Sequence, residues 1–255
     1  MLHPEKKPPL DDEVDGGLHV LNLVSGVLNR APSKHHFSRP RITLTYAQSL
    51  DGCVSANAGS KTRISNSACQ VFTHHLRSIH DAILVGVTTV LVDNPRLNVR
   101  LVGGNDPTPV IVDSRLRTPP DAHVLHHDNT EPIIFTTESA CPVRAARLAD
   151  AGVQVVRVAA GSGGRVDLSN VFRCLVDRGV GSVMVEGGAK VITSVLLGCF
   201  ADQLVLTLAP MILGGVHAVD NMHGIPPDLR PRLKSLSVEP VAGDLILHGE
   251  FERLE

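Results

Sequence analysis

Two glycines stand directly after a short apolar run that ends in an acid, at Glu186, Gly187 and Gly188. A helical pattern begins at Ala189, so the segment predicts a strand, a tight turn and a helix. Glycines leave room for a ligand to approach the backbone, and a helix N-terminus offers free N–H groups and a partial positive charge. The segment therefore predicts a site for nucleotide or dinucleotide phosphates, with tight packing alone as the alternative.

Polar side chains follow two more predicted strands. Asp51 comes after the strand predicted at residues 42–46, where an Asp-Gly pair is either an ordinary turn or part of a site. Thr89 and Asp93 follow the next strand, four residues apart, and would share one face of a helical turn. Loops at the carboxyl edge of a sheet are where α/β proteins bind ligands. A hydroxyl and a carboxylate on one face can bind ribose hydroxyls or an amide, whereas the alternative is a plain helix surface.

Arg77 and Arg100 are the candidate phosphate anchors, because the guanidinium fork matches phosphate oxygens; solvated surface charges are the alternative. No H-x-E is paired with P-C-x-x-C as in zinc deaminases, and neither G-x-G-x-x-G after the first strand nor a Walker A pattern occurs. Adjacent histidines are poor metal clamps, because neighbours on a helix or strand face different ways. Such pairs are His35 with His36, His74 with His75, and His126 with His127. No metal site is predicted.

The composition bounds the class of protein. The chain has 255 residues, of which 43% are apolar, and this is enough for one large α/β domain or two small ones. A net charge of −2 with no Trp and one Tyr argues against nucleic-acid partners and a basic membrane surface. The five cysteines form no C-x-x-C pair, which fits a reduced cytosolic protein.

The acidic N-terminus fits neither a secretory nor a mitochondrial signal, and no apolar run is long enough for a transmembrane helix. We expect a soluble cytoplasmic protein.

The order of predicted elements indicates the fold. Residues 1–17 are polar and acidic and predict a mobile tail. Apolar spacing predicts one short helix at residues 18–28, and a linker follows to residue 40. Ser67 with Gln70 predicts a capping box at the start of the next helix. Short apolar runs predict strands at residues 42–46, 82–85, 110–112, 133–135, 153–158, 182–185 and 204–208. Helical spacing predicts helices at residues 68–79, 168–176 and after 188. Residues 236–251 predict a β-hairpin. We expect an α/β fold with a mostly parallel central sheet flanked by helices and an antiparallel C-terminal hairpin, in which residues 1–40 are an N-terminal extension and residues 41–255 one domain.

Five segments, taken in order, resemble one family. They are TYAQSLDG at residues 45–52, LR with DAILVG at 76–86, TVLVDNPRLNVR at 89–100, VEGGA at 185–189 and APMILGG at 209–215. Together they are similar to the pyrimidine reductases of riboflavin biosynthesis, which are related in fold to dihydrofolate reductase. The resemblance spans residues 41 to the C-terminus.

The resemblance implies an enzyme that uses NADPH to reduce a ribosylaminopyrimidine 5′-phosphate to the ribitylamino compound. Bacterial members are usually fused behind a zinc deaminase, and the 40 residues before Arg41 are too few to hold one. The chain therefore resembles the stand-alone reductases of fungi and archaea. Thr45 supports this resemblance, because bacterial members often have Lys at that position. The implied substrate is 2,5-diamino-6-ribosylamino-4(3H)-pyrimidinone 5′-phosphate. The alternatives are the deaminated 5-amino-6-ribosylaminouracil phosphate, another pterin- or pyrimidine-like substrate, or a non-catalytic nucleotide-binding regulator. NADH stays possible, because no arginine cluster marks a 2′-phosphate site.

The resemblance also implies roles for single residues. The implied cofactor contacts are Ala47, Thr89, Asp93, Glu186, Gly187, Gly188 and Ala189, and the implied substrate contacts are Arg77, Leu97, Arg100 and Glu186. Nicotinamide C4 would deliver hydride to ribose C1′, and either Asp51 or bound water would protonate the ring oxygen. Related reductases also imply a cis peptide between Gly187 and Gly188 and a homodimer, in which the helix at residues 18–28 packs across the interface or onto its own domain.

Overall fold

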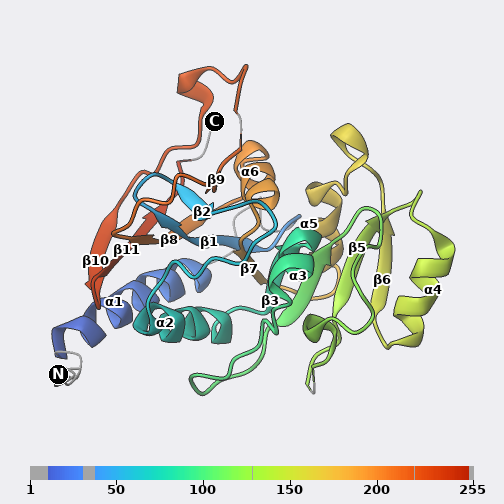
Figure 1. Ribbon diagram of the computed structural model, residues 1–255, viewed down its shortest axis with the longest axis horizontal. Helices are drawn as coiled ribbons and strands as arrows, with labels where there is room; N and C mark the ends of the chain where they lie inside the picture. Colours follow the sequence, from blue (N-terminus) through green and yellow to red (C-terminus); the bar gives the residue numbers. More distant parts are fainter. Residues whose placement is uncertain (1–10, 31–37, 128, 221, 253–255) are drawn as a thin grey trace.

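The computed structural model describes residues 11–30, 38–127, 129–220 and 222–252 of the chain. Within this part, nine strands form one sheet in the order β10-β11-β8-β1-β7-β3-β4-β5-β6 (Figure 1). The strands are β1 (Arg41–Ser49), β3 (Ala82–Gly86), β4 (Thr108–Val112), β5 (Ile133–Thr137), β6 (Gln154–Val158), β7 (Ser182–Glu186), β8 (Gln203–Ala209), β10 (Ser237–Val241) and β11 (Asp244–Glu250). Two short strands, β2 (Cys53–Ser55) and β9 (Val216–His217), form a separate pair.

The strand directions confirm the predicted mostly parallel sheet. Every pair from β8 through β1 and β7 to β6 is parallel, whereas β11 runs antiparallel to both β8 and β10. The inner strands are short apolar runs with both faces covered, as the five buried residues of β3 illustrate. The predicted hairpin at the C-terminus is also present, as β10 and β11.

Helices cover both faces of this sheet (Figure 1). They are α1 (Asp11–Leu28), α2 (Ser67–Ser78), α3 (Val87–Asp93), α4 (Pro142–Asp150), α5 (Leu168–Val176) and α6 (Ala189–Leu197). Val20 of α1, Leu76 of α2 and Leu148 of α4 belong to one buried core, and Phe172 of α5 and Ile192 of α6 belong to the other. Because side chains alternate along a strand, β3, β4, β5 and β7 each contribute to both cores, whereas the buried apolar residues of β1 belong to the second core alone.

Three local predictions differ from the structure. The first helix begins at Asp11 instead of residue 18, because residues 11–17 are mostly acidic residues and glycines and give no apolar periodicity. The cap of α2 is Asn66, not Ser67: the Asn66 side chain accepts a hydrogen bond from the Cys69 N–H, while Ser67 is already helical and exposed. The helix α4 was not predicted, because one buried residue, Leu148, leaves almost no apolar stripe. The predicted tail at residues 1–10 and most of the predicted linker, residues 31–37, lie outside the described residues.

Candidate functional site

The carboxyl ends of three adjacent parallel strands bring the predicted site residues to one edge of the sheet. In the order β1-β7-β3, the middle strand ends at Glu186, and Thr45 of β1 is level with Glu186 in the register. The predicted cofactor contact Ala47 lies two residues further along β1, on the same side of the strand and partly buried. Ligands of open α/β sheets bind at this edge.

The glycine turn after β7 has both features that the sequence suggested. Gly187 and Gly188 have φ of +80° and +84°, and Gly188 is the N-cap of α6. A Cβ on Gly187 would meet nothing within 4 Å, so its backbone is open, whereas a Cβ on Gly188 would lie 3.1 Å from the Thr89 hydroxyl. Gly86, at the end of β3, is a packing glycine, because a Cβ there would lie 2.8 Å from Val191. The turn therefore has open backbone at Gly187 and close packing against Thr89 of α3 at Gly188.

The predicted cis peptide between Gly187 and Gly188 is wrong. No peptide bond in the described residues is cis, and this one is trans. The positive φ of both glycines turns the chain from β7 into α6 without it, through a backbone conformation that residues with a Cβ rarely adopt.

Arg77 and Glu186 form a two-pronged ion pair at this edge. The Arg77 Nε and Nη2 donate to the two Glu186 carboxylate oxygens at 2.9 and 2.6 Å, and Nη1 donates to the Asn98 carbonyl at 3.0 Å. Arg77 is 7% exposed, and the Glu186 side chain is 26% exposed. The pair links α2, the end of β7 and the loop after α3. All three donor nitrogens of Arg77 have partners within the protein.

The loop that follows α3 is tightly held. Leu97 has a φ of +56° and is 1% exposed, so its side chain is anchored in the core. The Val99 N–H donates to Asp106 Oδ1 at 2.6 Å, and the Arg100 N–H donates to His74 Nδ1 at 3.1 Å. The Arg100 side chain is exposed and donates to the Asn98 amide oxygen at 3.0 Å.

Charges are concentrated around this loop. Burial raises the pKa of Asp93, the Glu186 carboxylate raises it further, and Lys61 opposes the shift. Burial and the neighbouring Arg77 and Arg96 lower the pKa of Arg100. Burial, followed by the charges of Arg77 and Arg100, lowers the pKa of His74 to about 4, so its ring is neutral at pH 7. A cationic guanidinium, two carboxylates and an open glycine backbone therefore lie within one region: the guanidinium suits a phosphate, and the carboxylates can accept hydrogen bonds from other polar groups of a ligand.

Asp51 makes no hydrogen bond to the residues described above; its carboxylate accepts hydrogen bonds from β1 and from the loop after β8. Its carboxylate accepts from the Ser49 hydroxyl, from the Leu213 N–H at 3.1 Å and from the Gly214 N–H at 2.6 Å. These bonds, that from Ser49 first, hold the pKa of Asp51 far below its usual range. Asp51 therefore fastens the loop after β8 to the turn after β1.

Three residues of this site were missed by the sequence analysis. Asn98 lies within the family segment at residues 89–100 but was given no role, Asp106 lies in a loop with no motif of its own, and His74 was considered only as half of a metal clamp. A signal for His74 existed: it is three residues before Arg77 on a helix, so both side chains face the same way.

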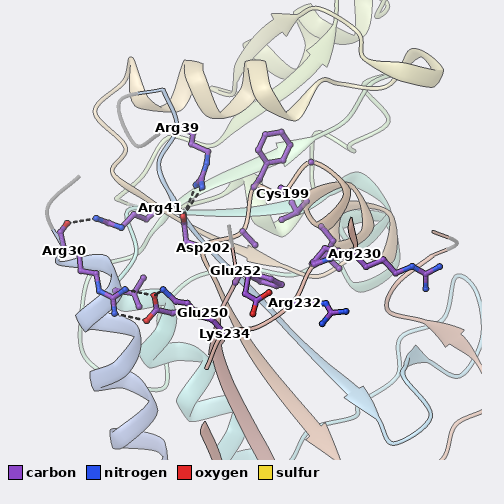
Figure 2. A pocket seen from close by; sticks show the side chains of 18 of the residues that line it. Arg30, Arg39, Arg41, Cys199, Asp202, Arg230, Arg232, Lys234, Glu250 and Glu252 are labelled. Atoms are coloured by element: carbon purple, nitrogen blue, oxygen red, sulfur yellow. Dashed lines mark hydrogen bonds and ion pairs between the residues drawn. The ribbon is translucent and has the colours of Figure 1, made fainter. Parts of the chain in front are cut away.

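A second polar region lies at the opposite edge of the sheet, where β1 and β8 begin and β11 ends. A cavity of about 740 Å³ is lined there by charged side chains (Figure 2). Arg39 donates to both oxygens of Asp202 at 2.7 and 2.9 Å, and Arg30 and Lys234 both bond Glu250. These pairs connect the helix α1 and the segment before β1 to the C-terminal strands. The cavity is separate from the glycine turn.

The described residues contain no group of three His, Cys, Asp or Glu side chains arranged to hold a metal ion. None of the helices in that part of the chain is long and apolar enough to span a membrane.

Fold and site together define an α/β protein with a glycine turn and an arginine–glutamate pair at the carboxyl edge of its sheet. The model of the RibD C-terminal domain family matches residues 40–247, and the chain belongs to that family. This confirms the resemblance drawn from the five sequence segments.

Relatives of known name indicate which members of this family the chain resembles. The chain is 41% identical over 180 residues to the 2,5-diamino-6-ribosylamino-4(3H)-pyrimidinone 5′-phosphate reductase of Methanothermobacter thermautotrophicus, covering 69% of this chain and 81% of that protein. It is 34% identical over 212 residues to the riboflavin biosynthesis protein RibD of Aquifex aeolicus, covering 82% of this chain but 57% of that protein. Among solved structures, the riboflavin biosynthesis reductase Rib7 of Saccharomyces cerevisiae is 28% identical with a TM-score of 0.70, covering 95% of this chain and all of that one (100%).

Proposed function

We propose that the protein reduces 2,5-diamino-6-ribosylamino-4(3H)-pyrimidinone 5′-phosphate to its ribitylamino product with NADPH. The observation that carries the proposal is family membership combined with an assembled site: the glycine turn, Thr89 and the Arg77–Glu186 pair lie together at the carboxyl edge. The archaeal relative, named for this substrate, is matched over 81% of its length and is more similar than the Aquifex protein, at 41% against 34% identity.

The turn after β7 fits the phosphates of a nicotinamide cofactor. Gly187 offers open backbone that a Cβ would fill, and α6 begins directly afterwards. In this proposal Gly187, Gly188 and Ala189 bind the phosphates, while Thr89 and Asp93 bind polar groups of the cofactor, with Ala47 beside them on β1. When bound, the cofactor supplies the hydride that reduces ribose C1′. NADPH is the proposed form, and NADH is the alternative.

The substrate would lie between the turn and the loop after α3. Arg100 anchors the 5′-phosphate, because its exposed guanidinium is at the open side of this loop. Glu186 accepts hydrogen bonds from the pyrimidine amino groups, and Leu97 and Arg77 hold the surrounding backbone. Orientation of the two reacting carbons and exclusion of water are then the main contributions of the protein.

Protonation of the ribose ring oxygen has two candidate sources, Asp51 and water. Asp51 is ionised and saturated with donors, so it has no proton to give at neutral pH. We therefore favour water. A donor role for Asp51 would make Asp51→Asn lose about 100-fold or more in turnover with NADPH affinity kept. A structural role predicts a smaller loss of turnover together with a lower free energy of unfolding, because the Leu213 and Gly214 N–H groups donate to different oxygens and the new amide N–H₂ would face one of them.

The test of the function is NADPH oxidation by the purified protein with the diamino compound, the deaminated compound and neither. Faster turnover of the diamino compound supports the proposal, and faster turnover of the deaminated compound reverses the order of reduction and deamination. Binding of NADPH without turnover of either substrate would favour another substrate or the regulatory alternative. Repeating the assay with NADH decides the cofactor.

The assembly and location are part of the same proposal. We propose a cytoplasmic homodimer, in which residues 41–255 form the reductase domain and residues 1–40 an extension; the family match, which begins at residue 40, supports that division. Sedimentation analysis should give twice the chain mass of 27.2 kDa. A mass of one chain would contradict the dimer.

A further inference from the structure

The backbone of three consecutive loop residues is held by three different side chains. The Asn98 carbonyl accepts from Arg77, the Val99 N–H donates to Asp106, and the Arg100 N–H donates to His74. A loop without helix or strand partners has no other regular way to satisfy these groups, and a buried unpaired backbone group is costly. The three side chains therefore determine the path of the loop that carries Arg100.

His74 is suited to the role of an acceptor. It lies on α2, is 3% exposed, and its Nδ1 accepts from a backbone N–H, so the ring proton resides on Nε2. The ring stays neutral because burial and the cations Arg77 and Arg100 lower its pKa to about 4, against the opposing influence of Glu186 and Asp106. A protonated ring would have no lone pair for the Arg100 N–H.

We propose that His74 is a positioning residue, which directs the Arg100 guanidinium toward the ligand phosphate by holding the Arg100 backbone N–H. Arg100 is anchored at two points: its backbone by His74 and its guanidinium by the Asn98 side chain, whose own backbone is held by Arg77. Loss of the first anchor would let the backbone rotate and would spread the guanidinium over several positions. The cost falls on binding of the phosphorylated substrate and leaves the cofactor side of the site intact. In its last step this inference rests on the proposed function, through Arg100 as phosphate anchor.

The first test replaces the acceptor without removing the bulk. His74→Phe keeps a ring but has no lone pair, whereas His74→Asn is smaller and places an oxygen near the position of Nδ1. We expect His74→Phe to raise the KM for the diamino substrate about tenfold, with kcat and the KM for NADPH within about twofold, since a lost buried hydrogen bond is typically of this size. We expect His74→Asn to restore most of the substrate affinity. The control is His75→Phe, at the neighbouring, less buried histidine, which should match the wild type.

The second test requires no substrate. Amide hydrogen exchange of Arg100, followed by ¹⁵N NMR, should be at least about tenfold faster in His74→Phe than in the wild type and should be slow again in His74→Asn. An unchanged exchange rate or an unchanged substrate KM in His74→Phe would overturn the proposal, as would equal losses in His74→Phe and His74→Asn, which indicate packing alone. If the wild type itself turns over no pyrimidine substrate, the proposed function fails, and the exchange rates still decide whether His74 holds Arg100.

Discussion

Arg77 illustrates how a residue identified from a motif acquires a different role in three dimensions. The sequence presents it as a free guanidinium available for a phosphate. In the structure its donors are used by Glu186 and Asn98, so its contribution to binding passes through the groups that it holds. Arg100, by contrast, keeps an exposed side chain. Motif matching identified both arginines but not that the guanidinium of Arg77 is buried in an ion pair while that of Arg100 is exposed, because this depends on partners distant in the sequence.

The Arg77–Glu186 pair should behave as a unit. Glu186→Gln leaves a mostly buried guanidinium without its carboxylate, and we expect a loss of about 2 kcal/mol in the free energy of unfolding; the partial exposure of Glu186 keeps the loss below that of a fully buried pair. Arg77→Met should cost a similar amount. In the double variant the losses should not add, and urea unfolding of all four proteins should give a coupling energy of about 1–2 kcal/mol. Additive losses would mean that the two side chains do not interact appreciably in solution.

Gly188 should be sensitive to a single methyl group. Gly188→Ala places a Cβ at a φ of +84° and 3.1 Å from the Thr89 hydroxyl, and we expect about 1–2 kcal/mol of strain. The matched control is Gly152→Ala, which has a similar φ of +80°, open surroundings and a position between α4 and β6, away from the site. Both variants should lose stability in urea unfolding, but only Gly188→Ala should lose NADPH affinity in a fluorescence titration. Equal NADPH affinities would argue against a cofactor role for the turn.

At the scale of elements, periodicity predicted what is buried on a regular pattern. The strands β3, β4, β5, β7 and β8 and the helix α5 agree with the apolar runs that predicted them, and the hairpin follows from its turn and flanking strands. The short pair of β2 and β9 could not be predicted, because its two strands are very short and distant in the sequence, and Gly215 packs directly against the Ser55 carbonyl of β2. Helix boundaries failed for a related reason: the cap of α2 was chosen by contacts outside the helix.

The cap of α2 gives a prediction at this scale. The Asn66 side chain accepts from the Cys69 N–H at 2.9 Å and donates to the Val241 carbonyl at 3.0 Å, so it fixes the start of α2 and joins it to β10. Asn66→Ala should lower the free energy of unfolding by about 1–2 kcal/mol. Ser67→Ala is the control and should change it by less than about 0.5 kcal/mol, because Ser67 is exposed. The reverse order in thermal or urea unfolding would restore the capping box of Ser67 and Gln70.

At the scale of the whole molecule, a buried polar chain that the sequence did not reveal joins α2 to three neighbouring strands of the sheet. His80 Nδ1 donates to the Leu76 carbonyl, which leaves Nε2 to accept from the Thr43 hydroxyl. Thr43 accepts from the Gln203 amide, and the Gln203 oxygen accepts from His248 Nε2. The chain runs from the end of α2 across the neighbouring strands β1, β8 and β11. Each member is 5% exposed or less, so every bond replaces water and the direction of each proton is determined.

The stability of the whole protein depends on pH, because burial keeps His80 neutral. Burial lowers the pKa of His80 from 6.5 to about 4, although the hydrogen bond to the Leu76 carbonyl and the charge of Asp81 both act to raise it. The unfolded chain binds a proton here below about pH 6.5, but the folded protein does so only near pH 4, so stability is full above 6.5 and falls as the pH drops through this window. A shift of this size corresponds to about 3 kcal/mol.

His74, with a pKa of about 4, adds a loss of the same sign, whereas Glu250, whose pKa is lowered from 4.5 to about 2, contributes only below pH 4.5. Urea unfolding at pH 7.5, 6.0 and 4.5 should therefore show a progressive decrease, and His80→Gln, although less stable at pH 7.5, should show a shallower one. A constant free energy of unfolding between pH 7.5 and 4.5 would mean that His80 is not held neutral by the fold.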